Sequence, residues 1–181
     1  DLAECHVLAP ELFALVAPLK RLLGRLRVKK RLDVHLALAD QGADVLISGA
    51  IPQGLEAAEA ITAFAERHAL ARLAFDDGYG PEVRWEPVAA TITLGGAPAP
   101  LPPAAFLQAT REGEAALVAA MREAVKGAPA VADLFAGLGT FALALPAKVY
   151  AAEGARDAIL SLKAGAARRS EEHTSELQSH H

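Results

Sequence analysis

Two glycines and an acidic residue in the last third of the chain have the spacing of a nucleotide-binding site. The segment from Val131 to Thr140 reads VADLFAGLGT, and Glu153 follows Thr140 by thirteen residues. Glycine lacks a Cβ atom, so the backbone at Gly137 and Gly139 can turn sharply and approach a ligand closely. A carboxylate such as that of Glu153 can accept hydrogen bonds from ribose hydroxyls. These residues therefore predict a site for a nucleotide cofactor.

The segments around this motif predict the elements that position it. An apolar run ending in Asp133 indicates a strand, the two glycines a turn, and Thr140 the start of an Ala/Leu-rich helix. Residues 148–152 then predict a second strand and residues 155–167 a further helix, while a helix at 110–126 precedes the motif. The order strand, helix, strand, helix is the beginning of a doubly wound α/β sheet of the Rossmann-like kind.

The glycine loop by itself does not identify the cofactor. The run from Gly137 to Ala142 satisfies GxGxxG/A, a pattern that NAD enzymes and methyltransferases share. Glu153 lies sixteen residues after Gly137, which is shorter than the separation of about 20 typical of the NAD fingerprint. From the loop alone, three hypotheses stay open: a methyltransferase, an NAD-dependent oxidoreductase, and a non-enzymatic α+β binding module in which the glycines only form a tight turn.

The first part of the chain, residues 1–103, predicts a small α+β domain. Leucine and valine recur at spacings of three and four over residues 10–26, which is typical of one apolar helix stripe, with Pro18 as a possible kink. Alternating apolar residues around the turn at 41–44 predict a β-hairpin. The remaining predicted elements are a helix at 57–69, strands at 72–75, 82–85 and 90–94, and turns at 76–80 and 95–100.

Composition limits the function classes further. The chain has 181 residues, an apolar content of 52% and no apolar run of the roughly 20 residues that a membrane helix needs. The net charge of −4 argues against wholesale electrostatic capture of nucleic acid, and the single cysteine, Cys5, excludes an internal disulfide. One dense basic cluster could nevertheless contact phosphates or be an ordinary solvated helix face. It comprises Lys20, Arg21, Arg25, Arg27, Lys29, Lys30 and Arg31.

Both ends of the sequence differ from what a complete globular domain would show. The chain starts at Asp1 without a methionine or a leader, which predicts truncation at the front. Residues 169–181 break the alanine-rich composition and resemble the translation of a sequencing-adapter oligonucleotide, so they predict an artefactual or disordered tail. We therefore assign no metal site to His173, His180 and His181.

Several motifs together resemble one enzyme family. The segment from Phe106 to Gln108 before a long helix, the run from Asp133 to Gly139, and Glu153 are similar to the RNA (uracil-5-)-methyltransferases that use S-adenosylmethionine. The opening run from Cys5 to Leu12 is similar to the cysteine-led segment of the iron–sulfur branch that acts on 23S ribosomal RNA. The resemblance covers about 165 residues and favours the methyltransferase hypothesis.

The resemblance implies a role for particular residues. The S-adenosylmethionine site would be lined by Gln108, Phe135, Thr140 and Glu153, with its loop shaped by Gly137 and Gly139. Cys5 would be one ligand of a [4Fe-4S] cluster. Residues 1–103 would be a central domain on the RNA and cluster side, and residues 104–168 the N-terminal part of the methyltransferase domain.

The resemblance also implies that RNA is the partner and that this chain lacks the catalytic residues. The parent would be a monomeric cytoplasmic enzyme that forms 5-methyluridine in RNA, in rRNA rather than tRNA, without contact to a membrane. C5 of uracil is a poor nucleophile, so a cysteine thiolate must first add at C6, and a base must later remove the C5 proton. In the family both groups follow the second strand, so this chain is expected to contain no catalytic residue and to be an inactive fragment.

Overall fold

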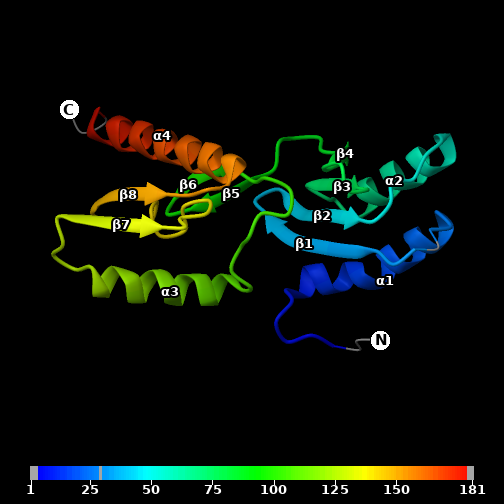
Figure 1. Ribbon diagram of the computed structural model, residues 1–181, viewed down its shortest axis with the longest axis horizontal. Coiled ribbons are helices and arrows are strands. Elements are labelled where there is room, and N and C mark those ends of the chain that lie inside the picture. The colour runs from blue at the N-terminus through cyan, green and yellow to red at the C-terminus, as the bar shows by residue number, and fades with distance from the viewer. Residues whose placement is uncertain (1–3, 29, 179–181) are drawn as a thin grey trace. The chain divides into compact units, whose positions relative to one another are not determined.

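The computed structural model describes residues 4–28 and 30–178, with side chains to residue 170. The chain divides into two compact units, Asp1–Ala90 and Thr91–His181, which are described separately below (Figure 1). This division lies before the boundary near residue 103 that the sequence predicts. The segment between the two positions forms a hairpin that packs within the second unit.

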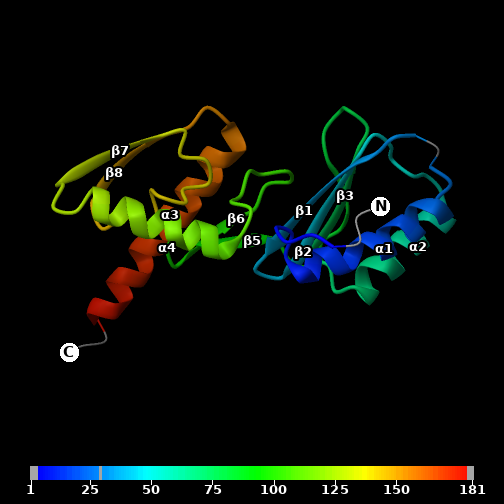
Figure 2. The same cartoon turned by 90° about the horizontal axis from the view of Figure 1, so that it is seen from below.

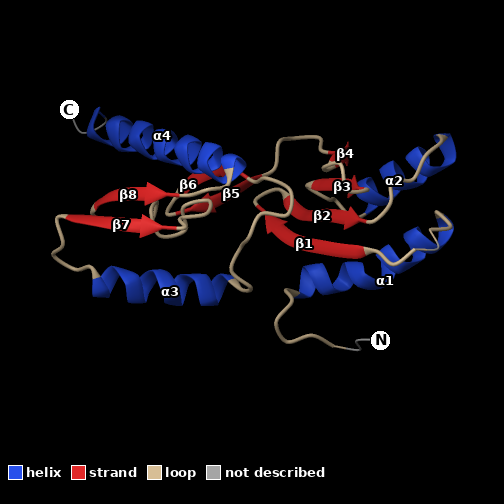
Figure 3. Ribbon diagram, viewed as in Figure 1, coloured by secondary structure: helices blue, strands red, loops and turns tan. Residues whose placement is uncertain are grey.

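The first unit is a four-stranded mixed sheet with two helices (Figures 1 and 3). Its elements in chain order are α1 (Pro10–Arg25), β1 (Asp33–Ala39), β2 (Gly42–Ser48), α2 (Leu55–Arg67), β3 (Arg72–Asp76) and β4 (Glu82–Trp85). The strand order is β1-β2-β3-β4, and only the central pair, β2 and β3, is parallel. α2 makes the crossover that a parallel pair requires. The predicted helices, hairpin and strands of this unit are confirmed.

The main core lies between the helices and one face of this sheet. Leucines spaced three and four apart on α1 form one buried stripe, and alternate residues of β2 and β3 face it, as the periods of helix and strand require. Pro18 lies inside α1, which continues on both sides of it. The largest contributors are Leu12, Leu15, Leu19, Leu22, Val45, Ile47, Ile61, Phe64, Leu73 and Phe75. Burial of each large side chain contributes about 1.5–3 kcal/mol relative to exposure.

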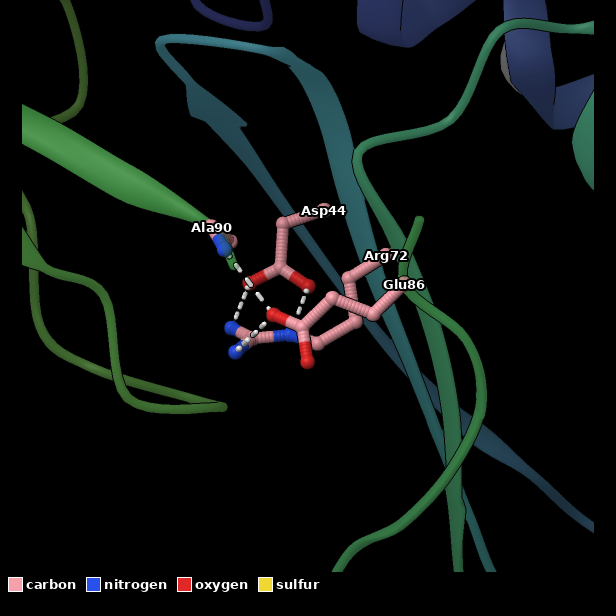
Figure 4. Close-up of polar contacts among 4 residues, drawn as sticks. All are labelled: Asp44, Arg72, Glu86 and Ala90. Atoms are coloured by element: carbon pink, nitrogen blue, oxygen red, sulfur yellow. Dashed lines mark hydrogen bonds and ion pairs between the residues drawn. The ribbon is translucent and has the colours of Figure 1, made fainter. Parts of the chain in front are cut away.

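A buried ion pair occupies the other face of the two central strands. Asp44 on β2 and Arg72 on β3 are only 2% and 4% exposed. Two hydrogen bonds join them, from Arg72 Nε to Oδ1 at 2.9 Å and from Nη2 to Oδ2 at 2.6 Å (Figure 4). Glu86 lies 3.5 Å from the same guanidinium and accepts a hydrogen bond from the backbone N–H of Ala90. The guanidinium is therefore held between two carboxylates.

The second unit contains two small sheets and two helices. Its elements are β5 (Thr91–Leu94), β6 (Ala97–Pro100), α3 (Arg111–Ala124), β7 (Ala130–Leu134), β8 (Lys148–Ala152) and α4 (Arg156–Gln178). β5 and β6 form an antiparallel hairpin, although the sequence predicted residues 95–100 as a turn. That prediction was wrong because the turn needs only Gly95 and Gly96. Both have positive φ, and the strand starts at the next residue.

Helix α4 packs against this hairpin. The Ser161 hydroxyl is buried and donates to the carbonyl of Pro100 at 2.5 Å, and Arg168 donates to the carbonyl of Pro98 at 2.8 Å. Proline carbonyls of β6 are thus satisfied by side chains of a helix more than sixty residues later. The structure continues α4 to Gln178, beyond residue 169 where the sequence predicts an artefactual or disordered tail; the origin of that tail stays a prediction.

Strands β7 and β8 form a parallel pair in the register Ala130↔Lys148 to Leu134↔Ala152. The predicted helix beginning at Thr140 is absent from the described connection, which consists of successive turns. Hydrogen bonds from Leu143 N to Gly139 O and from Leu145 N to Phe141 O start a helical ladder, but Pro146 follows at once. Proline has no N–H to continue the ladder and restricts the residue before it, so that prediction was wrong. The chain is confirmed as a mixed α/β protein.

Candidate cofactor site

The loop after β7 has an unusual backbone conformation. Phe135 follows the strand with a φ of +60°, and its side chain is 91% exposed. A positive φ is uncommon for a residue with a bulky side chain and costs of order 1–3 kcal/mol, which is why such residues concentrate at ligand sites. The loop therefore presents an aromatic ring to solvent at the end of a strand.

Glu153 fastens this loop to the end of the neighbouring strand. It follows β8 directly, and because Leu134 pairs with Ala152, the two strands end at the same edge. Its Oε2 accepts a hydrogen bond from Gly137 N at 2.9 Å, and its Oε1 accepts one from Ala155 N at 2.8 Å. These backbone hydrogen bonds lower the pKa of the Glu153 carboxyl. The carboxylate stays ionised near neutral pH and, with two lone pairs on each oxygen, can accept further hydrogen bonds.

The two glycines of the loop serve different purposes. Gly139 has a φ of +102°, and a Cβ there would lie 2.5 Å from Leu162 Cδ1 of α4 and 3.0 Å from Leu143 Cγ. Packing therefore excludes a side chain at Gly139. Gly137 has a φ of +56°, but a Cβ there would meet no atom within 4 Å. Gly137 is thus the point where the loop leaves open space for a ligand beside the Glu153 carboxylate.

Asp133 is a polar residue of this site that the sequence prediction did not include. It is the fourth residue of β7, and its Oδ2 is buried without a hydrogen-bond partner in the part of the chain that the structure describes. Burial raises the pKa of Asp133, and a hydrogen bond from the backbone of Ala142 opposes that rise. The signal was present, because Asp133 begins the DLFAGLG run, but its burial depends on the folding of the following turns.

The raised pKa of Asp133 predicts how stability depends on pH. Above the pKa of the unfolded chain, the unfolded state loses this proton more readily than the folded state, so the contribution of Asp133 to stability falls as pH rises. We expect Asp133→Asn, which cannot ionise, to gain stability relative to the parent between acid and neutral pH. Urea unfolding across a pH series measures this. The exposed Asp157→Asn is the control, and a pH-independent difference for Asp133→Asn would contradict the prediction.

The remaining predicted residues are only partly brought together. Gln108 is half-buried and lies just before Thr110, whose hydroxyl caps α3 by accepting from Gly113 N at 3.0 Å. Because α3 leads by a short connection into β7, its N-terminus lies at the end of the unit where β7 stops (Figures 1 and 2). Within the described residues, no hydrogen bond joins Gln108 to the loop. Thr140 lies in the turns after Gly139 and caps no helix.

Cys5 has the chemistry of a thiolate ligand, but the described residues form no metal-binding group around it. Its Sγ accepts a hydrogen bond from Leu8 N at 3.3 Å, and hydrogen bonds from the backbone of Leu8 and Val7 lower the pKa of the thiol. Among the described residues, no group of three His, Cys, Asp or Glu side chains is placed to hold a metal ion. Cys5 could therefore supply one ligand of a cluster, and the described residues do not complete such a site. Nor does any helix in the described ranges have the length and apolarity to cross a membrane.

Comparison with known proteins finds relatives that are named as RNA methyltransferases. No family model matches the chain. A Zymomonas mobilis protein named as an uncharacterized RNA methyltransferase is 50% identical over 170 residues, which cover 92% of this chain and 43% of that protein. A 23S rRNA (uracil(1939)-C(5))-methyltransferase of Thiobacillus denitrificans is 30% identical over 186 residues, covering 96% of this chain and 43% of the relative. The corresponding enzyme of Edwardsiella ictaluri is 35% identical over 147 residues, with coverages of 80% and 33%.

These matches confirm the resemblance that the motifs indicated. They do not favour the oxidoreductase or the binding-module hypothesis, and the chain spans less than half the length of the relatives it matches. The chain is therefore homologous to part of the RNA methyltransferases, including enzymes named for C5 methylation of a 23S rRNA uracil.

Proposed function

We propose that this chain is part of an S-adenosylmethionine-dependent methyltransferase that forms 5-methyluridine in RNA, with rRNA as the substrate. The observation that carries the proposal is the hydrogen bond between Gly137 N and the Glu153 carboxylate, which joins a glycine loop to an acidic strand end. The names of the relatives from Thiobacillus and Edwardsiella support the choice of uracil and of rRNA. On this proposal β7 and β8 begin a Rossmann-like methyltransferase sheet.

Each residue of the site has a separate role in binding the cofactor in this proposal. Glu153 accepts hydrogen bonds from the ribose hydroxyls, for which its ionised state suits it. Gly137 would leave room for the ligand, and the exposed Phe135 ring would line the site as an apolar wall. Gln108 and Thr140 provide polar groups near the methyl donor. When bound, S-adenosylmethionine supplies an electrophilic methyl group.

Other parts of the proposal concern the parent protein. Residues 1–103 would form its RNA-facing and cluster-bearing domain, and residues 104–168 the start of its methyltransferase domain. Cys5 would be one ligand of its iron–sulfur cluster, and the parent would work as a cytoplasmic monomer. We assign no catalytic residue to this chain, because Cys5 lies in the first unit and has the role of a ligand in this proposal.

Calorimetric titration tests the choice of cofactor. We expect S-adenosylhomocysteine, the demethylated product form, to bind the chain and NAD to bind much more weakly. The loop and Glu153 fit one ribose and its purine, and their separation is shorter than in the NAD fingerprint. Binding of NAD alone would overturn the proposal and restore the oxidoreductase hypothesis, and binding of neither ligand would favour the non-enzymatic module.

A further inference from the structure

A groove between α1 and α2 lies within the first unit and has no role in the cofactor site. Figure 2 shows the two helices next to each other. The groove has a volume of about 410 Å³. Its polar lining consists of Arg21, Arg25, Glu56, Glu59, Arg67 and His68. Its apolar floor includes Leu22 and Phe64, which belong to the core.

The chain topology separates the charges along this groove. α1 leads into β1, which is antiparallel to β2, and α2 runs back from β2 to β3, so α1 and α2 are antiparallel. Arg21 on α1 therefore lies toward the C-terminal end of α2, where Arg67 and His68 are. Glu56 and Glu59 lie toward the other end, near Arg25. One end of the groove thus concentrates positive charge.

The arginines at that end are available for a ligand. In the described part of the chain, neither Arg21 nor Arg67 forms an ion pair or a side-chain hydrogen bond, and both are exposed. Arg72 and Arg84, by contrast, are both paired with carboxylates. Further basic side chains follow α1 beyond its C-terminal, Arg25 end, namely Arg27, Lys30 and Arg31. Guanidinium groups without a carboxylate partner, such as those of Arg21 and Arg67, suit the binding of phosphate groups.

The pKa of His68 responds to the positive charge at this end of the groove. Its ring packs on Phe64 with a centroid separation of 4.6 Å and an interplanar angle of 46°. Burial lowers the pKa of His68, and the nearby charges of Arg67 and Arg21 lower it further. An anion bound between the two arginines would offset their repulsion of the imidazolium and raise the pKa of His68 again.

We propose that the α1–α2 groove binds the phosphate backbone of single-stranded RNA, with Arg21 and Arg67 as its phosphate contacts. This rests on the proposed function in that RNA is the partner, whereas the groove itself is argued from its charges. Glu56 and Glu59 disfavour a phosphate at the opposite end, so the strand enters at the Arg21–Arg67 end. Of the basic cluster recognised in the sequence, Arg21 is thus the residue assigned to a phosphate contact.

Binding of a fluorescein-labelled oligouridylate to the full chain, followed by anisotropy, tests the groove. We expect Arg21→Gln/Arg67→Gln to weaken binding on the order of tenfold. The slope of log K against log salt should fall in magnitude by about 1.4, because each lost phosphate contact on a single strand accounts for about 0.7. Glu56→Gln/Glu59→Gln should tighten binding. The control Lys126→Gln/Lys163→Gln removes the same charge from exposed positions of the second unit and should change affinity much less. Equal losses in the arginine and lysine variants would overturn the proposal.

NMR titration of the His68 ring gives a readout that a folding defect does not imitate. The oligouridylate should raise the pKa of His68 in the parent and leave it nearly unchanged in the arginine variant. A stronger effect from polyglutamate than from oligouridylate would overturn RNA as the partner. This test is separate from the cofactor test. If the arginine variant loses oligouridylate binding but still binds S-adenosylhomocysteine, the result concerns the groove alone. Failure of S-adenosylhomocysteine to bind concerns the proposed function alone.

Discussion

Glu153→Ala is expected to weaken binding of S-adenosylhomocysteine by about 30- to 150-fold. The substitution removes the acceptor for the ribose hydroxyls. It also removes the hydrogen bonds to Gly137 N and Ala155 N, so the glycine loop loses its attachment to the end of β8. Hydrogen bonds to charged groups are stronger than those between neutral groups, so the loss is expected to exceed about tenfold. Calorimetric titration of the parent and the variant measures the loss.

Two further variants make this result specific. Glu153→Gln retains one acceptor oxygen without the charge and should fall between the parent and Glu153→Ala. Asp157→Ala removes an exposed carboxylate one helical turn later and should bind as the parent does. If Glu153→Ala bound S-adenosylhomocysteine as tightly as the parent, the assignment of the ribose site to this strand end would be wrong.

Arg72→Met is expected to lower the free energy of unfolding by about 3–5 kcal/mol. The substitution preserves much of the apolar stem but removes the guanidinium that is bonded to both oxygens of Asp44. Asp44 would then be a buried carboxylate without a partner, which is far more costly than the absence of the whole pair. Chemical denaturation followed by circular dichroism measures the effect.

The comparison with two other variants identifies the cause. Asp44→Asn/Arg72→Met removes both charges and should recover a substantial part of the lost stability. Lys126→Met breaks an exposed pair with Glu123 and should cost no more than about 1 kcal/mol. If the free energy of unfolding of Arg72→Met were no lower than that of Asp44→Asn/Arg72→Met, the uncompensated charge of Asp44 would not be the source of the loss.

The first unit could be predicted well from the sequence because its signals are local. The leucine stripe of α1 and the alternation in β1 and β2 reflect which face each element buries, so the period alone identifies them. The buried pair of Asp44 and Arg72 could not be predicted in this way. The two residues are 28 positions apart and meet only because β2 and β3 are parallel neighbours.

The second unit shows where local signals mislead. β6 reads Ala-Pro-Ala-Pro, a composition typical of a loop, and it becomes a strand through pairing with β5 and the support of α4. The segment after Thr140 has a helical composition, but it is too short before Pro146 to form a helix. Tertiary pairing in the first case and a proline in the second override propensity.

Part of the geometry of the candidate cofactor site was predictable, because residue type determines it there. The two glycines and Glu153 were predicted from their types and spacing, and the structure places Gly137 and Glu153 in direct contact. Asp133 was missed because its unpartnered oxygen depends on how the following turns cover it. The cofactor roles of all six residues, Gln108, Phe135, Gly137, Gly139, Thr140 and Glu153, stay predictions.

The link from Arg72 through Glu86 to Ala90 has a mechanical consequence. Ala90 is the last residue of the first unit, and its backbone is hydrogen-bonded to a carboxylate that lies against the guanidinium on β3. That guanidinium is in turn bonded to β2. A pull on the chain at this junction is therefore transmitted to the two central strands of the sheet and does not simply peel β4 away from its edge. The cluster of Asp44, Arg72 and Glu86 thus anchors the last residue of the first unit to its two central strands.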